Sequence, residues 1–321
     1  MKAVQVIEPG KVIFVDTPKP ELQPGHALVR PSKLSLCGSD IRMLYHANPN
    51  EYPFPPGTTG HEMVGVIEEI EPNHPEFKKG DHVLALAPGH RAMAEFYLAP
   101  FEHVLPLRSE RTPVQMLQAQ QLGTVLYASQ KLPSVASKTV VVIGQGSAGL
   151  WFNFHLRRLG ARKVIALDLE GFRLKNSAHF GATHQINNRE VDAQEAVRQL
   201  NDGELADVVI EAAGEVDSIN LAVHLVKQYG DILFFGYPRG QYISFDFEDF
   251  FHKCCRSTTI VGATCETDQT STRIALDIIA DGEINVDPLL THEIPFNDVF
   301  DAYELHRTRE DEAVKIVIDM P

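Results

Sequence analysis

Three short motifs contain the residue types most able to do chemistry. Cys37-Gly38-Ser39-Asp40 and Gly60-His61-Glu62 lie early in the chain, and Gly144-Gln145-Gly146-Ser147-Ala148-Gly149 follows far downstream. A thiolate, an imidazole and nearby carboxylates can together hold a zinc ion. A glycine-rich turn between a strand and a helix can hold the pyrophosphate of a dinucleotide. The combination favours alcohol chemistry with a nicotinamide cofactor.

The composition narrows the class of protein. The chain has 321 residues, enough for two domains, and a net charge of -14 with no basic stripe argues against nucleic-acid binding. The four cysteines, Cys37, Cys254, Cys255 and Cys265, show no disulfide-type spacing. The first residues read at once as a strand, and no apolar run reaches membrane-spanning length. We therefore expect a cytoplasmic protein with a small-molecule substrate and no nucleic-acid or membrane partner.

The periodicity predicts two kinds of domain within an α/β fold. Up to about residue 110, short apolar runs between Pro and Gly predict an irregular β domain. From Lys138 onward, apolar strands alternate with helical segments, which predicts a doubly wound parallel sheet. The expected strands are 139–143, 163–167, 206–211, 231–236 and 259–262, and the expected helices are 150–159, 172–180 and 272–280. A last strand at 314–318 returns to the first domain, which gives residues 1–120 with 269–321 as one domain and 121–268 as the other.

The glycine motif has the context that a dinucleotide site needs. Gly144 permits a tight turn, Gly146 lets the backbone approach the pyrophosphate, and Gly149 lets the helix pack close to the strand. The backbone N–H groups of Ser147 and Ala148, at the helix start, would meet the phosphates.

The residues at and after the end of the second strand of this domain bear on the choice between NAD and NADP. Asp168 ends that strand, where its carboxylate can accept hydrogen bonds from the adenosine ribose and repel a 2'-phosphate, so NAD is favoured over NADP. Arg173 can stack on adenine or meet a 2'-phosphate. Asp168 can alternatively be a strand-end carboxylate that caps the next helix. Gly214 and Tyr237 complete the predicted cofactor-binding residues.

These motifs identify a family resemblance that runs the whole length of the chain. Cys37-Gly38-Ser39-Asp40 and Gly60-His61-Glu62 are its most specific parts, together with Gly80-Asp81-His82-Val83 and Ala94-Glu95-Phe96. The chain resembles the medium-chain dehydrogenase/reductase superfamily, and within it the zinc-dependent alcohol and polyol dehydrogenases. The resemblance implies a GroES-like catalytic domain plus a Rossmann domain, in a homodimer or homotetramer. Residues 240–247, whose alternation leaves one apolar face, are a candidate contributor to the subunit contact.

The resemblance also implies roles for the early motifs. Cys37 and His61 correspond to zinc ligands, Asp40 to an acceptor that orients His61, and Glu62 to an acidic neighbour that can also ligate. Ser39 corresponds to the hydroxyl that takes the substrate proton. Zinc would lower the pKa of the alcohol and hold it beside the nicotinamide.

Three departures from the family pattern bear on that site. The third ligand position holds Gln120, whose amide oxygen carries no charge and is a poor zinc ligand. Arg42 stands where a histidine often ends the proton relay, so release passes through water, the nearby His46 or the cofactor ribose; His46 can also be a surface residue. The cysteine-rich lobe of a structural zinc is missing, so we expect one catalytic zinc and no structural zinc.

The sequence therefore favours NAD-dependent, zinc-assisted oxidation of a secondary alcohol of the polyol, sugar or cyclitol type. Gln120 leaves open a zinc-free quinone or enone reductase. A catalytically silent nucleotide-binding protein is a further alternative, although a decaying site would have no physical reason to keep the other chemistry-bearing residues together.

Overall fold

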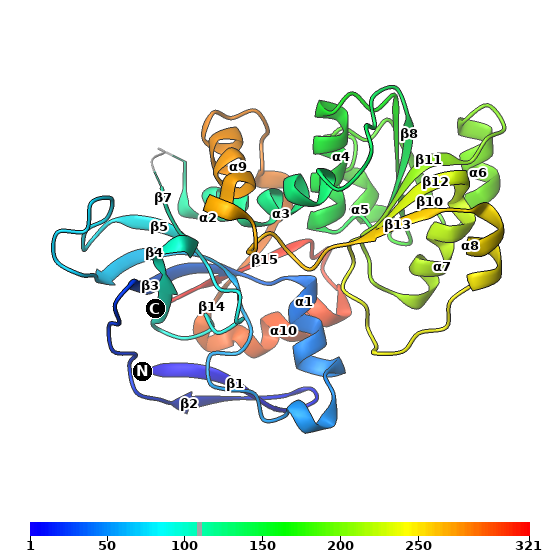
Figure 1. Cartoon of the computed structure of the whole chain (residues 1–321). Coiled ribbons are helices and arrows are strands. Elements are labelled where there is room, and N and C mark those ends of the chain that lie inside the picture. Colours follow the sequence, from blue (N-terminus) through cyan, green and yellow to red (C-terminus); the bar gives the residue numbers. More distant parts are fainter. Residues whose placement is uncertain (108–110) are drawn as a thin grey trace. The chain divides into compact units, whose positions relative to one another are not determined.

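The chain divides into two compact units, which are described separately. The computed structural model describes residues 1–107 and 111–321 (Figure 1). Unit 1 comprises Met1–Gly123 and Ala263–Pro321, and unit 2 comprises Thr124–Gly262. The combination of sheets and helices confirms the predicted α/β class. No helix in the described part of the chain is long and apolar enough to span a membrane.

Unit 1 is built on a sheet of seven strands. Their order is β14-β15-β3-β4-β5-β7, with β6 also paired to β3, and β1 and β2 form a separate hairpin. The C-terminal β15 runs antiparallel to β3, so the end of the chain shares one sheet with strands from its first third (Figure 1). The strands are β1 (Lys2–Glu8), β2 (Lys11–Asp16), β3 (His26–Ser35), β4 (Glu62–Glu69), β5 (His82–Leu86), β6 (Tyr97–Pro100), β7 (Val104–Pro106), β14 (Leu290–Pro295) and β15 (Lys315–Asp319).

Short helices cover and connect these strands, and one buried apolar core joins them. The core combines side chains of β3, β4 and β5 with side chains of the C-terminal segment, including Phe296 and Tyr303. The helices are α1 (Gly38–Ile41), η1 (Arg42–His46), η2 (Pro49–Glu51), η3 (Phe101–His103), α2 (Pro113–Leu117), α3 (Ala119–Ser129), which continues into unit 2, η4 (Thr267–Gln269), α9 (Thr270–Ala280), η5 (Asp287–Leu289), η6 (Phe296–Asp298) and α10 (Val299–Thr308).

Unit 2 confirms the predicted doubly wound parallel sheet. Its strand order is β10-β9-β8-β11-β12-β13, and all of its strand pairs are parallel. The chain first moves outward from β8 to β10 and then crosses to β11, so the strand order reverses between β8 and β11. The strands are β8 (Thr139–Ile143), β9 (Lys163–Asp168), β10 (His184–Asn187), β11 (Ala206–Glu211), β12 (Val226–Phe234) and β13 (Arg256–Thr259).

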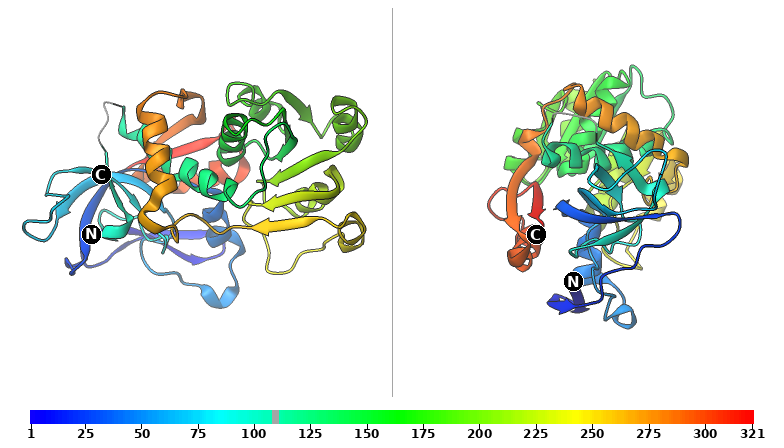
Figure 2. Two further views of the ribbon diagram at one scale, coloured as in Figure 1. Left: turned by 45° about the horizontal axis from the view of Figure 1, so that its top comes forward. Right: turned by 90° about the vertical axis from the view of Figure 1, so that its left-hand side faces the viewer.

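The helices of unit 2 flank this sheet. Helices α4 and α5 pack against β8, β9 and β10, whereas α7 and α8 pack against β11 and β12. The left view of Figure 2 shows β12 and β13 side by side at one edge of the sheet. The helices are α4 (Ser147–Arg158), α5 (Gly171–Lys175), α6 (Ala193–Leu200), α7 (Val216–Leu225) and α8 (Phe247–Lys253).

Some predicted elements differ from the structure. The strand expected at 231–236 is β12 at Val226–Phe234, which begins five residues earlier. The strand expected at 259–262 is β13 at Arg256–Thr259. It is a mostly exposed edge strand, and it is defined by its pairing with β12 rather than by apolar residues. The helix expected at 172–180 ends at Lys175 and continues as turns up to Gly181. Residues 240–247 form no strand: 240–246 are irregular and Phe247 begins α8. Their part in a subunit contact stays a prediction.

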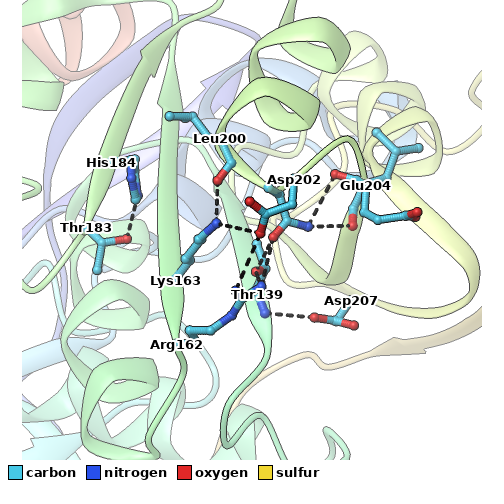
Figure 3. A network of polar contacts seen from close by, with 11 residues as sticks. Thr139, Arg162, Lys163, Thr183, His184, Leu200, Asp202, Glu204 and Asp207 are labelled. Atoms are coloured by element: carbon cyan, nitrogen blue, oxygen red, sulfur yellow. Dashed lines mark hydrogen bonds and ion pairs between the residues drawn. The ribbon is translucent and has the colours of Figure 1, made fainter.

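A polar network ties together the amino ends of the unit 2 strands (Figure 3). The backbone N–H of Thr139, which begins β8, donates to Asp207 Oδ2 at 2.8 Å, and the Thr139 hydroxyl donates to Asn201 at 2.7 Å. Lys163, which begins β9, donates to the carbonyl of Leu200 at 2.5 Å and lies 3.6 Å from Asp202. With this edge tied together by its own side chains, the carboxyl edge is the one that presents loops to a ligand.

Candidate functional site

Strand register in unit 1 brings Ser35, Glu62 and Lys315 to one face of the sheet. Ser35 of β3 lies opposite Glu62 of β4 and also opposite Val317 of β15. Because side chains alternate along a strand, Lys315 points to the same face as Val317. Cys37 follows β3 after one residue, and His61 immediately precedes β4. The motifs far apart in sequence therefore meet at the ends of neighbouring strands.

Cys37, His61 and Glu62 form a compact set of potential metal ligands. One ligand atom from each residue lies within 4.8 Å of the other two. His61 Nε2 lies 3.8 Å from Glu62 Oε1. Glu62 Oε1 and His61 Nδ1 are both buried without a hydrogen-bond partner. Buried polar atoms are normally paired, so these orphaned atoms indicate that the cluster has a binding function.

The second carboxylate oxygen of Glu62 is firmly held. Lys315 Nζ donates to Glu62 Oε2 at 2.5 Å, and the Ser35 hydroxyl donates to the same oxygen. The side chains of Lys315 and Glu62 are each only 1% exposed. With Oε2 anchored in this way, Oε1 is the oxygen that remains available to a ligand.

The state of the Cys37 thiol depends on a cation. Burial and the negative charge of Glu62 raise the pKa of Cys37 to about 12, although Lys315 opposes this effect. The thiol is therefore protonated when no metal is bound. A divalent cation beside the sulfur would reverse this balance and stabilise the thiolate.

Asp40 connects the two ligand loops through their backbones. It accepts hydrogen bonds from the Cys37 N–H at 2.8 Å and the Gly60 N–H at 3.1 Å. Its carboxylate makes no hydrogen bond to the His61 ring in the structure, although His61 lies near enough to act on it electrostatically. Burial would raise the pKa of Asp40, but His90 and His61 beside it lower that pKa to about 2. Asp40 thus remains ionised and fixes both loops.

The predicted proton-relay residues are not joined directly. The Ser39 hydroxyl is buried and has no hydrogen-bond partner, which leaves it available to a substrate but not bonded to His46. His46 ends η1 and is exposed. Arg42 forms an ion pair with Glu51 at 3.0 Å. A relay from Ser39 to His46 would require an intervening water.

The donor set of the cluster fits zinc. Thiolate sulfur, imidazole nitrogen and carboxylate oxygen are the three donor types that zinc uses in proteins. Gln120, predicted at the third ligand position, lies in α3 with 6% of its surface exposed. Glu62 supplies the anionic oxygen that Gln120 lacks. The placement of Gln120 among the ligands stays a prediction.

The glycine motif of unit 2 forms the expected tight turn between β8 and α4. Gly144 has φ +89°, a left-handed conformation that glycine adopts without strain. A Cβ on Gly149 would lie 1.8 Å from the Gly144 carbonyl oxygen, so the helix and strand approach as closely as predicted. Gly146 is the N-cap of α4, which leaves the N–H groups of Ser147, Ala148 and Gly149 without partners inside the helix. These groups form an anion-binding helix start.

Asp168 and Arg173 both lie against this turn. Asp168 Oδ2 accepts from the Gln145 N–H at 2.6 Å, and Oδ1 accepts from the Glu170 N–H at 2.9 Å. A carboxylate has about four acceptor positions, so both oxygens retain capacity for ribose hydroxyls. Arg173 Nη1 lies 3.5 Å from where a Cβ on Gly146 would stand.

The last two predicted cofactor residues also lie together. Gly214 follows β11 and has φ +76°, and Tyr237 follows β12. A Cβ on Gly214 would lie 2.2 Å from the Tyr237 carbonyl oxygen, so the two loops are in close contact at the carboxyl edge of the sheet.

Sequence reasoning missed the roles of Lys315 and Ser35 in this site. Lys315 is a lone charge within the otherwise apolar run 314–318, a signal that could have identified it as buried and paired. His90 Nδ1 lies 3.8 Å from Asp40 Oδ1, and its ring centroid is 4.3 Å from that of His61. His90 is therefore a neighbour of the metal-ligand cluster.

Comparison with known proteins agrees with both units. Residues 23–108 match the alcohol dehydrogenase GroES-like domain family, and residues 149–281 match the zinc-binding dehydrogenase family. The chain belongs to the medium-chain dehydrogenase/reductase superfamily. It is accordingly an oxidoreductase of the alcohol dehydrogenase type, as the sequence predicted.

Relatives extend over almost the whole chain. An alcohol dehydrogenase of Cupriavidus necator is 26% identical over 366 residues, covering 99% of this chain and 98% of the relative. D-xylulose reductase A of Aspergillus oryzae is 25% identical, covering 96% and 93%. The solved alcohol dehydrogenase TADH from Thermus sp. ATN1 has a TM-score of 0.82 at 24% identity, with complete coverage of both chains. This likeness confirms the predicted combination of GroES-like and Rossmann folds.

The glycine geometry predicts opposite outcomes for two neighbouring alanine substitutions. Gly149→Ala places a Cβ 1.8 Å from a backbone oxygen and should destabilise unit 2 by about 3 kcal/mol or more. A Cβ on Gly146, whose φ is −69°, would meet only Arg173 at 3.5 Å, so Gly146→Ala should fold normally. It should nevertheless weaken binding of a nicotinamide dinucleotide about tenfold or more. Thermal unfolding and NAD titration calorimetry measure the two effects. Unchanged NAD affinity in folded Gly146→Ala would contradict the pyrophosphate assignment.

The buried ion pair predicts a large difference between two lysine substitutions in the same sheet. Lys315→Met leaves the Glu62 carboxylate buried without its cation and should lower the free energy of unfolding by about 3–5 kcal/mol. Lys33→Met, the control, removes a more exposed lysine paired with Glu293 and Asp319, and should cost less than about 1 kcal/mol. Denaturant unfolding in the presence of a metal chelator compares the two variants. Equal losses of unfolding free energy in the two variants would show that the buried Lys315–Glu62 pair stabilises the fold no more than the exposed pairs of Lys33 do.

Proposed function

We propose that this chain catalyses the NAD-dependent, zinc-assisted oxidation of a secondary alcohol to a ketone, and the reverse reduction. The substrate is of the polyol, sugar or cyclitol type. The cluster of Cys37, His61 and Glu62 supports the proposal most strongly, because it combines three donor types within 4.8 Å and includes a buried, unpartnered carboxylate oxygen. Relatives named alcohol dehydrogenase and D-xylulose reductase support the alcohol and polyol substrate class.

The residues of unit 1 have separate roles in this reaction. Cys37, His61 and Glu62 would hold the zinc, while Asp40 fixes the two loops that bear the first two ligands. When bound, zinc supplies a Lewis acid that lowers the pKa of the alcohol hydroxyl. The unpartnered hydroxyl of Ser39 can accept the alcohol proton while donating its own, because a hydroxyl is both donor and acceptor. The proton then leaves through water, His46 or the cofactor ribose.

The residues of unit 2 would bind the dinucleotide. The N–H groups at the start of α4 would bind the pyrophosphate, and Asp168 would accept hydrogen bonds from the adenosine ribose. The bonds from Gln145 and Glu170 keep the Asp168 carboxylate directed at the turn. Its negative charge favours NAD over NADP, with Arg173, Gly214 and Tyr237 completing the site. The nicotinamide is the hydride acceptor.

Two further features belong to the proposal. The chain would carry one catalytic zinc and no structural zinc, because Cys254, Cys255 and Cys265 are too few for a four-cysteine site. The chain would act as a homodimer or homotetramer, as the family resemblance implies.

Zinc content and turnover together test the function. Protein purified without chelator should contain close to one zinc per chain and reduce NAD with at least one member of a secondary alcohol and polyol panel. Cys37→Ser should lose both properties because its hydroxyl is a weak zinc ligand, whereas Cys265→Ser, the control, should keep both. Elemental mass spectrometry and NADH absorbance are the measurements. No zinc, and none regained on incubation, would instead favour the reductase or silent-binder alternatives.

Cofactor choice is tested by substituting Asp168. Asp168→Ser removes the charge that repels a 2'-phosphate and should shift the ratio of NADP to NAD affinity towards NADP by about tenfold or more. Glu170→Ser removes a neighbouring charge and serves as the control, with a smaller shift expected. Fluorescence titration of each nucleotide gives the dissociation constants. If the affinities for NAD and NADP changed together in Asp168→Ser, the ribose assignment would be wrong.

A further inference from the structure

One helix near the C-terminus contacts both loops that carry the cysteine and histidine ligands. Tyr303 and His306 lie three residues apart on α10, so they share one face of the helix. The Tyr303 hydroxyl and the Thr59 hydroxyl share a hydrogen bond of 2.5 Å. His306 Nε2 donates to the carbonyl oxygen of Cys37 at 3.1 Å. Neither side chain belongs to the metal-ligand cluster, yet each holds a segment next to a ligand.

The segment before His61 is backbone-strained. Thr59 has φ +89°, which for a β-branched residue is a true outlier and therefore a strained conformation. Thr59 is fully buried, and its carbonyl accepts from the Met93 N–H at 3.2 Å. This conformation directs the next N–H, that of Gly60, to Asp40 Oδ1. The Tyr303 bond therefore holds a strained residue whose geometry sets the position of His61.

The segment at Cys37 is held in a similar way. The Cys37 carbonyl accepts two hydrogen bonds, one from the Asp40 N–H at 3.0 Å and one from His306. The Cys37 N–H donates to Asp40 Oδ2. Both polar backbone groups of the ligand are thus engaged, and only its thiol is left to bind.

Helix α10 is itself rigidly placed. Tyr303 is 2% exposed and belongs to the unit 1 core together with Val299 and Ala302. Phe300 packs on Phe14 with ring centroids 4.7 Å apart, and the helix contacts β14 and β15. A helix fixed on both sides can hold the loops that it contacts.

We propose that Tyr303 and His306 are positioning residues for the metal site. They act through Thr59 and Cys37, and they set the affinity for the metal and the geometry of the sulfur and imidazole ligands without touching the metal. This inference rests on the proposed metal site, and it adds to that site two residues that its motifs do not contain.

Cobalt titration of chelator-stripped protein tests the proposal, because cobalt gives a sulfur-to-metal absorption band and ligand-field bands that report on ligand geometry. Tyr303→Phe should weaken cobalt binding about tenfold and shift the ligand-field bands. Tyr97→Phe, at a partly buried tyrosine of β6, is the control and should bind cobalt as the wild type does. Thr59→Val removes the partner hydroxyl at nearly constant volume. If the two hydroxyls act as one contact, the double variant should bind no more weakly than either single variant.

His306 provides a rescue experiment. His306→Ala should weaken cobalt binding, whereas His306→Gln keeps an N–H donor for the Cys37 carbonyl and should restore most of the affinity. Unfolding of the stripped variants is measured separately, so that loss of fold is not mistaken for loss of positioning.

The outcomes separate this inference from the function on which it rests. Wild-type affinity and spectrum in both Tyr303→Phe and His306→Ala would overturn the positioning role, even if zinc and turnover are as proposed. Equal losses in His306→Ala and His306→Gln would overturn the role of the donated hydrogen bond. Absence of a sulfur-to-cobalt band in the wild type would overturn the metal site itself.

Discussion

The buried ion pair between Lys315 and Glu62 is the interaction on which the unit 1 site depends. Both side chains are almost completely excluded from water, and each charge would be very costly there without the other. The pair, with Ser35, occupies one carboxylate oxygen and leaves the other unpartnered beside His61. A single contact thus neutralises a buried acid, connects β15 to β4 and orients a potential ligand atom.

The potential metal ligands and the residues that hold them in place come from distant segments of the chain. The ligands come from residues 37–62, where short motifs set them at the ends of β3 and β4. The residues that hold those ligands come largely from the last quarter of the chain: Lys315 on β15, and Tyr303 and His306 on α10. Because β15 pairs with β3 and α10 packs against β15, the fold places the ligands beside the residues that hold them.

The sequence predicted best what depends on local pattern. The alternation of apolar strands and helices predicts the parallel sheet of unit 2, and the glycine spacing predicts its tight turn, because both are governed by neighbouring residues. Cys37, His61 and Glu62 were identifiable because metal ligands are restricted to few residue types. Strand β13 was misplaced because its polar, exposed sequence gives no apolar signal, and only pairing with β12 defines it.

Contacts set by long-range register were beyond the sequence. Asp40 was expected to bond the His61 ring, but the fold places the amides of Cys37 and Gly60 at its two oxygens. Tyr303 and His306 look like ordinary residues of an amphipathic helix, since nothing local shows what α10 packs against. Of these contacts, only that of Lys315 is indicated in the sequence, by a single charge within an apolar run.

The central claim is that Cys37, His61 and Glu62 bind zinc, and X-ray absorption at the zinc edge of the purified wild-type protein tests it most directly. One sulfur scatterer at about 2.3 Å, with nitrogen and oxygen scatterers at about 2.0–2.2 Å that include an imidazole, is the predicted result. A spectrum without sulfur, or with several sulfur scatterers, would contradict the claim.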